Sequence, residues 1–309
     1  MRSNAPRATA VLPRAFEVRY TPARMDRARR SWLSVGLAFA GVGCSGAGPG
    51  AVEATVTDGS IGVLEVERTD GSREGGQRTA LSAAFARYRG LDTGEVLGLV
   101  GHRLSGSLES CEFTAEGEAL AHGEGEVELL DVGGIRVRLA GAELTLAPRA
   151  FPDLASVMAG VFYAGDAQLV APRAEIDEYT FDAAGSFEVP AFDAVVPAPS
   201  GLPEVRIGDA WLAEGVALDR ETGFELAWAA GDADDRVEVE LRAHGDVLRC
   251  VARDDGATRI DAEALAPLAP DPEATLVVRR VRIVPLDISG LDEAFARVSV
   301  ARAVSAALD

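Results

Sequence analysis

The chain has 309 residues, a formal net charge of −19 and no lysine, so every basic side chain except histidine is an arginine. A surface with this excess of acids repels phosphate backbones and anionic lipid head groups, which disfavours nucleic-acid binding and electrostatic adhesion to membranes. The lack of lysine excludes Schiff-base chemistry and a phosphate-loop lysine.

Residues 25–43 have the three parts of a secretory signal peptide. A short arginine run is followed by an uncharged, largely apolar stretch over residues 32–42, and small residues then lead to Cys44. This stretch is too short for a membrane-spanning helix, which needs about 20 apolar residues. We therefore expect residues 25–43 to be removed, residues 1–24 to be a mis-annotated N-terminal extension, and residues 44–50 to form a flexible tether.

The residues before Cys44 resemble the lipobox of bacterial lipoproteins, in which the cysteine thiol is acylated and becomes the new N-terminus. Gly43 fits this pattern, whereas Gly41 stands where the family usually has leucine. The resemblance implies attachment to a membrane through an acyl chain at Cys44. It also implies a place in the cell envelope, as an outer membrane lipoprotein that faces the periplasm or the exterior. The alternative is an ordinary cleaved signal peptide with an incidental cysteine.

From residue 51 onward, alternating apolar and polar residues are separated by Gly, Asp and Pro turns, which predicts an all-β fold. Residues 52–57 and 62–66 are expected to form a hairpin around Asp58 and Gly59, because Asp-Gly is a strong turn dipeptide. Residues 79–88 fit either a strand or a helix, and the pattern does not decide between them.

Residues 151–162 interrupt the alternation. Pro152 and Asp153 suit a first helical turn, so we expect one short helix near residues 151–162. Residues 197–203 are rich in proline and have no pattern, which is typical of a linker between domains. The prediction is therefore two β-sandwich-like domains, an N-terminal β-domain over residues 51–196 and a second domain over residues 204–309.

The second domain has a distinctive pair of strands. Phe224, Leu226 and Trp228 alternate onto one face, and Cys250 follows Trp228 by 22 residues. With the acidic turn between them, these residues resemble the central strands of immunoglobulin and fibronectin type III domains. The resemblance implies an immunoglobulin-like β-sandwich and carries no function. The whole layout is similar to that of uncharacterised bacterial lipoproteins, which leaves the activity open.

Two cysteines follow the tether, Cys111 and Cys250, separated by 139 residues. In an oxidising envelope compartment they can form a disulfide. Two buried free thiols in separate domains are the alternative.

Few side chains point to a ligand. Asp232, Asp234 and Asp235 place three carboxylates in one loop, which makes calcium the only candidate cofactor, although aspartate is also common in turns. Trp211 is the candidate binding residue, because an exposed tryptophan can stack on a sugar ring.

No arrangement of residues indicates catalysis. His102, His122 and His244 stand in no catalytic setting, so we expect no catalytic residues. The sequence favours a non-enzymatic binding or structural module with a protein or polysaccharide partner. The alternatives are a carbohydrate-binding or calcium-dependent adhesion module, and a hydrolase of unrecognised type that uses Asp or Glu.

Overall fold

The structure is a computed structural model that describes residues 57–70, 77–101, 106–117, 125–139, 142–154, 158–169, 176–201 and 205–309. These residues belong to one compact unit, Glu53–Asp309. The signal peptide, Cys44 and the tether lie outside the described residues, so the predictions about them stay predictions.

Strands make up most of this part of the chain, which confirms the all-β prediction. The two helices are short, α1 (Thr93–Leu99) and α2 (Ala262–Leu265). The strands, in chain order, are β1 (Thr57–Asp70), β2 (Gln77–Leu91), β3 (Ser110–Thr114), β4 (Glu126–Leu129), β5 (Ile135–Leu139), β6 (Ala142–Leu154), β7 (Met158–Leu169), β8 (Glu178–Ala183), β9 (Phe192–Pro197), β10 (Arg206–Ile207), β11 (Ala210–Trp211), β12 (Val216–Leu218), β13 (Phe224–Ala227), β14 (Arg236–Ala243), β15 (Asp246–Arg253), β16 (Ala257–Ile260), β17 (Asp271–Pro285) and β18 (Glu293–Leu308).

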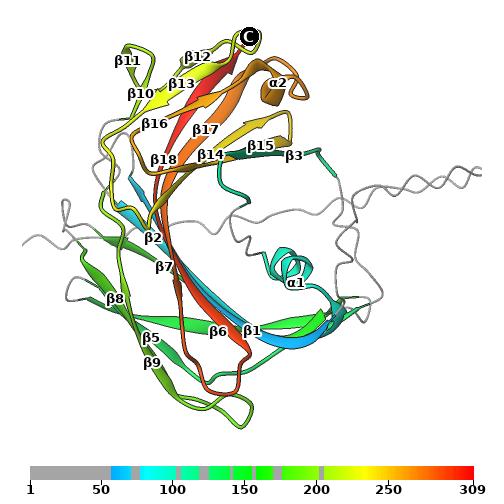
Figure 1. Cartoon of the computed structure of the whole chain (residues 1–309). Coiled ribbons are helices and arrows are strands. Elements are labelled where there is room, and N and C mark those ends of the chain that lie inside the picture. Colours follow the sequence, from blue (N-terminus) through cyan, green and yellow to red (C-terminus); the bar gives the residue numbers. More distant parts are fainter. Residues whose placement is uncertain are drawn as a thin grey trace, which may run out of the picture. The chain divides into compact units, whose positions relative to one another are not determined.

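Fourteen strands form one curved sheet in which the long strands β17, β18, β1 and β2 are neighbours (Figure 1). The order is β3-β15-β14-β17-β18-β1-β2-β4-β7-β6-β5-β8-β9, and β12 pairs with the far end of β18. The other four strands form a second sheet in the order β11-β10-β13-β16.

The first and last described strands are neighbours in the large sheet. β1 pairs in parallel with β18 from Ile61 opposite Glu293 to Thr69 opposite Ala301. Strands from both sides of the expected linker therefore lie in one sheet, and Glu53–Asp309 is one compact unit. The structure thus differs from the expected division into residues 51–196 and 204–309.

Ser200 and Gly201, in the segment expected as a linker, bond a buried arginine of the large sheet. Arg280 of β17 is 1% exposed, and its Nη1 donates to Ser200 Oγ at 2.8 Å. Its Nη2 donates to Asp254 Oδ1 at 3.0 Å, and the same oxygen accepts from Trp228 Nε1 at 2.7 Å. The Pro-rich composition that favours a linker gives no sign of this anchoring.

Alternation along the strands places two hydrophobic clusters on one face of the large sheet. Val237, Val239 and Leu241 of β14 pack against the four-stranded sheet. Leu64 and Val66 of β1 lie in the second cluster, which includes residues of β5, β8 and β9. Each such side chain contributes about 1.5–3 kcal/mol when fully buried. These packed layers give the structure its sandwich-like arrangement.

The opposite face of the large sheet carries a third cluster beneath α1, which lies on the concave side (Figure 1). Ile61 and Val63 of β1 pack there with Val96 and Leu97 of α1. Asp92 begins the helix with a capping box, because its side chain accepts from Glu95 N and the Glu95 side chain accepts from Asp92 N.

The short helix expected near residues 151–162 is wrong. Residues 151–154 belong to β6 and residues 158–162 to β7, and these strands pair antiparallel from Ala147 opposite Ala164 to Leu154 opposite Met158. Gly160 is needed here, because its φ is 130° and a Cβ atom would collide with the backbone oxygen of Leu129 in β4. Pairing with strands on both sides outweighs the local helical signal.

The hairpin expected at Asp58 and Gly59 is also wrong, because β1 continues through both residues. The aromatic ring of Tyr88 packs on Gly59, where a Cβ would lie 2.7 Å from the tyrosine hydroxyl. Residues 79–88 are part of strand β2, which runs antiparallel to β1.

Candidate functional site

The concave face of the large sheet becomes charged next to α1. Along β1, the buried Ile61 and Val63 are followed on the same face by Glu65 and Glu67. The strand register places Arg297 of β18 beside Glu65, and Arg279 of β17 beside Glu238 of β14. Charged side chains from distant parts of the chain therefore meet on one surface.

One end of this surface is acidic around a single arginine. Arg297 donates from Nη1 to Glu65 at 2.7 Å and from Nη2 to Glu238 at 2.5 Å, and its side chain is 8% exposed. Burial lowers the pKa of Arg297, but the charges of Glu238 and Glu65 outweigh burial and raise it. The guanidinium therefore stays charged.

The other end gathers three arginines around Glu240 of β14. Arg242 Nε donates to Oε1 at 2.5 Å, Arg249 Nε donates to Oε2 at 2.8 Å, and Arg279 Nη1 donates to Oε2 at 3.3 Å. Burial raises the pKa of the Glu240 carboxyl, but Arg279, Arg249 and Arg242 together lower it to about 2. Arg279 also bonds Glu67 at 2.8 Å, and the charge of Glu67 helps to raise the pKa of Arg297, so Glu67 acts electrostatically on both ends.

This network borders a cavity of about 410 Å³. The charged lining comes from β1, β14, β15, β17 and β18. Gly98 and Gly101, at the end of α1, and Ser110 and Glu112 of β3 also line the wall. A volume of this size is typical of small-molecule sites. We call it the charged cavity.

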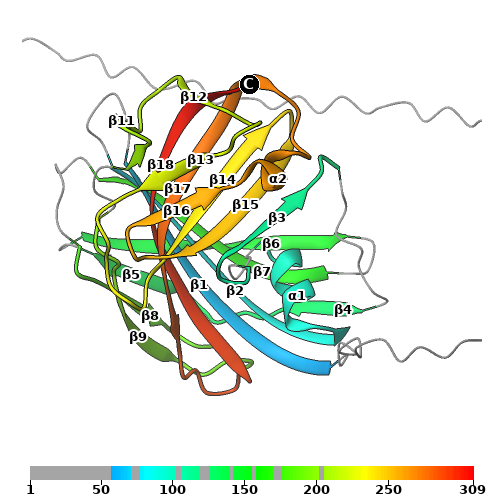
Figure 2. The ribbon, with the colours of Figure 1, turned by 45° about the horizontal axis from the view of Figure 1, so that its top comes forward.

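A disulfide between Cys111 and Cys250 holds β3 on the sheet edge beside β15 (Figure 2). The two cysteines are directly opposed in the strand register, and the next opposed pair, Glu112 and Arg249, lies on the cavity face. The free-thiol alternative assumed separate domains, whereas both cysteines lie in the same sheet.

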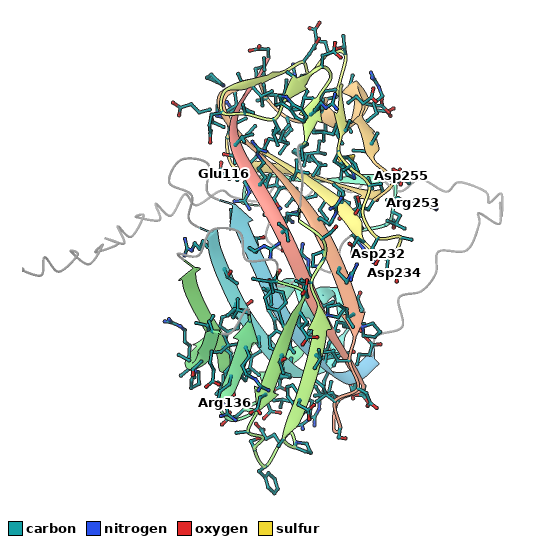
Figure 3. The ribbon with its side chains drawn as sticks, turned by 90° about the vertical axis from the view of Figure 1, so that its left-hand side faces the viewer. Glu116, Arg136, Asp232, Asp234, Arg253 and Asp255 are labelled. Carbon is teal, nitrogen blue, oxygen red and sulfur yellow. A yellow bond between two sulfur atoms is a disulfide. The ribbon has the colours of Figure 1, made fainter. Side chains whose placement is uncertain are left out.

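Two of the three aspartates proposed for calcium, Asp232 and Asp235, bond an arginine. Arg282 donates from Nε to Asp235 Oδ1 at 2.6 Å and from Nη2 to Asp232 Oδ2 at 3.0 Å. Asp232 and Asp234 lie at the surface (Figure 3). Within the described ranges, no three His, Cys, Asp or Glu side chains are arranged to hold a metal ion.

Trp211, the candidate binding residue, is 52% exposed on the edge strand β11. The Arg206 guanidinium lies 4.7 Å from the centre of its ring. This cation–π contact covers part of the indole, so the tryptophan is exposed and already holds an arginine. It lies in the four-stranded sheet, whose residues do not line the charged cavity.

His244 lies in the turn between β14 and β15, as the sequence indicates. Its φ is 50°, its N–H donates to Asp271 Oδ2 at 2.9 Å, and its ring Nε2 lies 2.9 Å from the Pro270 oxygen. These contacts give it a structural role in the turn. His102 and His122 lie outside the described residues.

The charged cavity was not predicted from the sequence. One signal was present, because Arg279 stands in the apolar strand β17, where a buried arginine requires partners. A second was the alternation of Glu238, Glu240 and Arg242 in β14. No local pattern shows which distant strands bring the counter-charges.

None of the helices in the described part of the chain is long and apolar enough to cross a membrane. Comparison with protein-family models, curated proteins and solved structures found no match.

Proposed function

We propose that the chain is an envelope lipoprotein, acylated at Cys44, that acts as a non-enzymatic binding module with the charged cavity as its ligand site. The signal-like residues 25–43 and the small residues before Cys44 support the anchor. The cavity of about 410 Å³ beside a buried ion-pair network carries the binding role. We further propose that the anchor holds the module at the outer membrane, facing the periplasm or the exterior.

The buried charges favour a functional over a purely stabilising role. Glu240 and Arg297 have side chains that are 5% and 8% exposed. Burying such pairs costs several kcal/mol per ion in desolvation, and apolar residues of similar size often stabilise a fold as well or better. Charges kept beside a cavity offer directed donors and acceptors to a ligand.

The same charges argue against the hydrolase alternative. A general acid of a glycosidase needs a carboxyl pKa raised towards neutrality. The pKa of Glu240 is instead lowered to about 2 by its arginines, so this carboxylate holds no proton to donate near pH 7. Among the described residues that line the cavity there is no histidine.

Two elements that line the cavity, α1 and β3, are fixed to the sheet, which favours binding without large rearrangement. The capping box stabilises the start of α1, and Val96 and Leu97 pack the helix against the sheet. The disulfide links β3 covalently to β15. Trp211 supports carbohydrate as a second candidate ligand, at a separate surface, because its ring is half exposed.

The anchor is tested by metabolic labelling with a radioactive fatty acid. We expect label on the wild-type chain and none on Cys44→Ser. Equal labelling of the two chains would contradict acylation at Cys44.

The binding site is tested by obstructing the cavity. Ser110→Trp adds a large side chain at the cavity wall, whereas Thr114→Trp adds it on the same strand outside the lining. In a thermal-shift screen of small charged molecules, compounds that stabilise the wild type should still stabilise Thr114→Trp and fail with Ser110→Trp. Compounds that act equally on both variants would place the site elsewhere.

A further inference from the structure

We propose that the arginine end of the charged cavity binds the anionic group, carboxylate or phosphate, of a small ligand, with Arg242 and Arg249 as its direct contacts. This inference rests on the proposed function, because it names the ligand chemistry of the same cavity. Its basis is the hydrogen-bond capacity around Glu240.

The acceptor positions of the Glu240 carboxylate are all occupied. A carboxylate offers about four acceptor positions. Oε1 receives Nε and Nη2 of Arg242, and Oε2 receives Arg249 Nε and Arg279 Nη1. Any remaining donor on these arginines must therefore find another acceptor.

Arg249 and Arg242 have such donors. Neither Nη atom of Arg249 has a hydrogen-bond partner among the described residues, and Nη1 of Arg242 has none there either. Their side chains are 37% and 54% exposed, and both line the cavity. A guanidinium with free terminal nitrogens presents a planar fork that fits carboxylate and phosphate oxygens.

The local charge balance is compatible with an anion. Around Glu240, the three guanidiniums face the two buried or half-buried carboxylates Glu240 and Glu67. Glu112 stands opposite Arg249 in the register and is exposed. No hydrogen bond joins Glu112 to Arg249 in the described part of the chain, so an anion competes there only with an exposed, solvated carboxylate.

The rest of the molecule limits the ligand to a small one. The net charge of −19 repels extended polyanions, and long-range repulsion is screened only beyond about 8–10 Å at physiological salt. An anion is therefore held by contact with the arginine forks inside the cavity, whose volume of about 410 Å³ suits a small molecule.

The experiment is isothermal titration calorimetry on the full chain at constant ionic strength. Inorganic phosphate and acetate are the anionic probes, and comparing them distinguishes a phosphate ligand from a carboxylate ligand. Ethylammonium is the cationic probe. Arg242→Gln and Arg249→Gln remove a fork, Arg249→Lys keeps the charge without the fork, and circular-dichroism melting checks that each variant folds. Arg253→Gln is the matched control, since Arg253 lies on the same strand, is 69% exposed and lies outside the lining.

We expect saturable binding of phosphate or acetate to the wild type and to Arg253→Gln. Each Gln variant should weaken binding about 10- to 100-fold, and Arg249→Lys should weaken it less. Unchanged anion binding in folded Arg249→Gln, or no saturable anion binding to the wild type, would overturn the inference. If ethylammonium alone binds, and Glu238→Gln abolishes that binding, the cavity remains the ligand site and only the anion assignment fails. If none of the three probes binds, the anion assignment fails, and the thermal-shift comparison of Ser110→Trp with Thr114→Trp decides the proposed site separately.

Discussion

Arg297 of β18 donates to Glu65 of β1 at 2.7 Å, although 232 residues separate them in the chain. They are direct neighbours in the parallel register of the two strands. The charged cavity therefore forms only when the first and last described strands pair. Its ion pairs depend on the assembly of the large sheet.

Acid should weaken the fold through Glu240. Its pKa of about 2 in the folded chain lies below its ordinary value of 4.5, so its contribution is fully present above about pH 5 and is lost as the pH falls towards 2. The shift corresponds to about 3 kcal/mol. Urea unfolding from pH 7 to pH 2.5 measures it.

The control for this prediction is Glu240→Gln, which removes the titrating group. It should cost about 3–5 kcal/mol at pH 7, because it breaks the buried ion pair of Glu240 and Arg279, whose side chains are 5% and 12% exposed. Its stability should also fall less between pH 5 and pH 2.5 than that of the wild type. Parallel pH profiles for the two chains would show that Glu240 is not the group responsible.

Loss of the Cys111–Cys250 disulfide should destabilise the fold by about 2–5 kcal/mol. Mass spectrometry without reduction should show the two cysteine peptides joined, and a Cys111→Ser, Cys250→Ser chain should melt at a lower temperature. Rapid alkylation of both thiols in the unreduced, folded protein would contradict the disulfide.

Trp228 should be needed for stability and Trp211 should not. Trp228→Ala removes a side chain that is 7% exposed and the donor to Asp254, at a cost of about 3–5 kcal/mol. Trp211→Ala, at a 52% exposed position, should change the free energy of unfolding by about 0.5 kcal/mol or less. Equal melting temperatures for the two variants would place Trp228 outside the core.

Gly160→Ala tests the hairpin that replaces the expected helix. The new Cβ would meet the Leu129 backbone oxygen at a φ of 130°, so the variant should lose about 1–3 kcal/mol or more. Gly134→Ala is the control, because a Cβ there has nothing within 4 Å. Were residues 151–162 a helix, Gly160→Ala would instead stabilise the chain.

The sequence predicts which residues of a strand are buried better than it predicts which strands meet. Phe224, Leu226 and Trp228 share a buried face, as their alternation indicates. The alternation of Glu238 and Glu240 likewise shows that they share a face, but not that this face borders a cavity.

The remaining differences have one physical cause. Local signals at Asp58 and Gly59, at residues 151–162 and at residues 197–203 were overruled by contacts with distant segments, such as Tyr88 on Gly59 and Arg280 on Ser200. In contrast, α1 follows a local signal, the Asp92 and Glu95 capping box, that could have been recognised.

The most direct test of the charged cavity as a binding site is NMR of the arginine Nε–H groups during titration with phosphate or acetate. We predict saturable shifts at Arg242 and Arg249, both in the cavity lining, with Arg253 unchanged. Shifts that are equal at all three arginines, or no shifts at Arg242 and Arg249, would contradict a binding site at that end of the cavity.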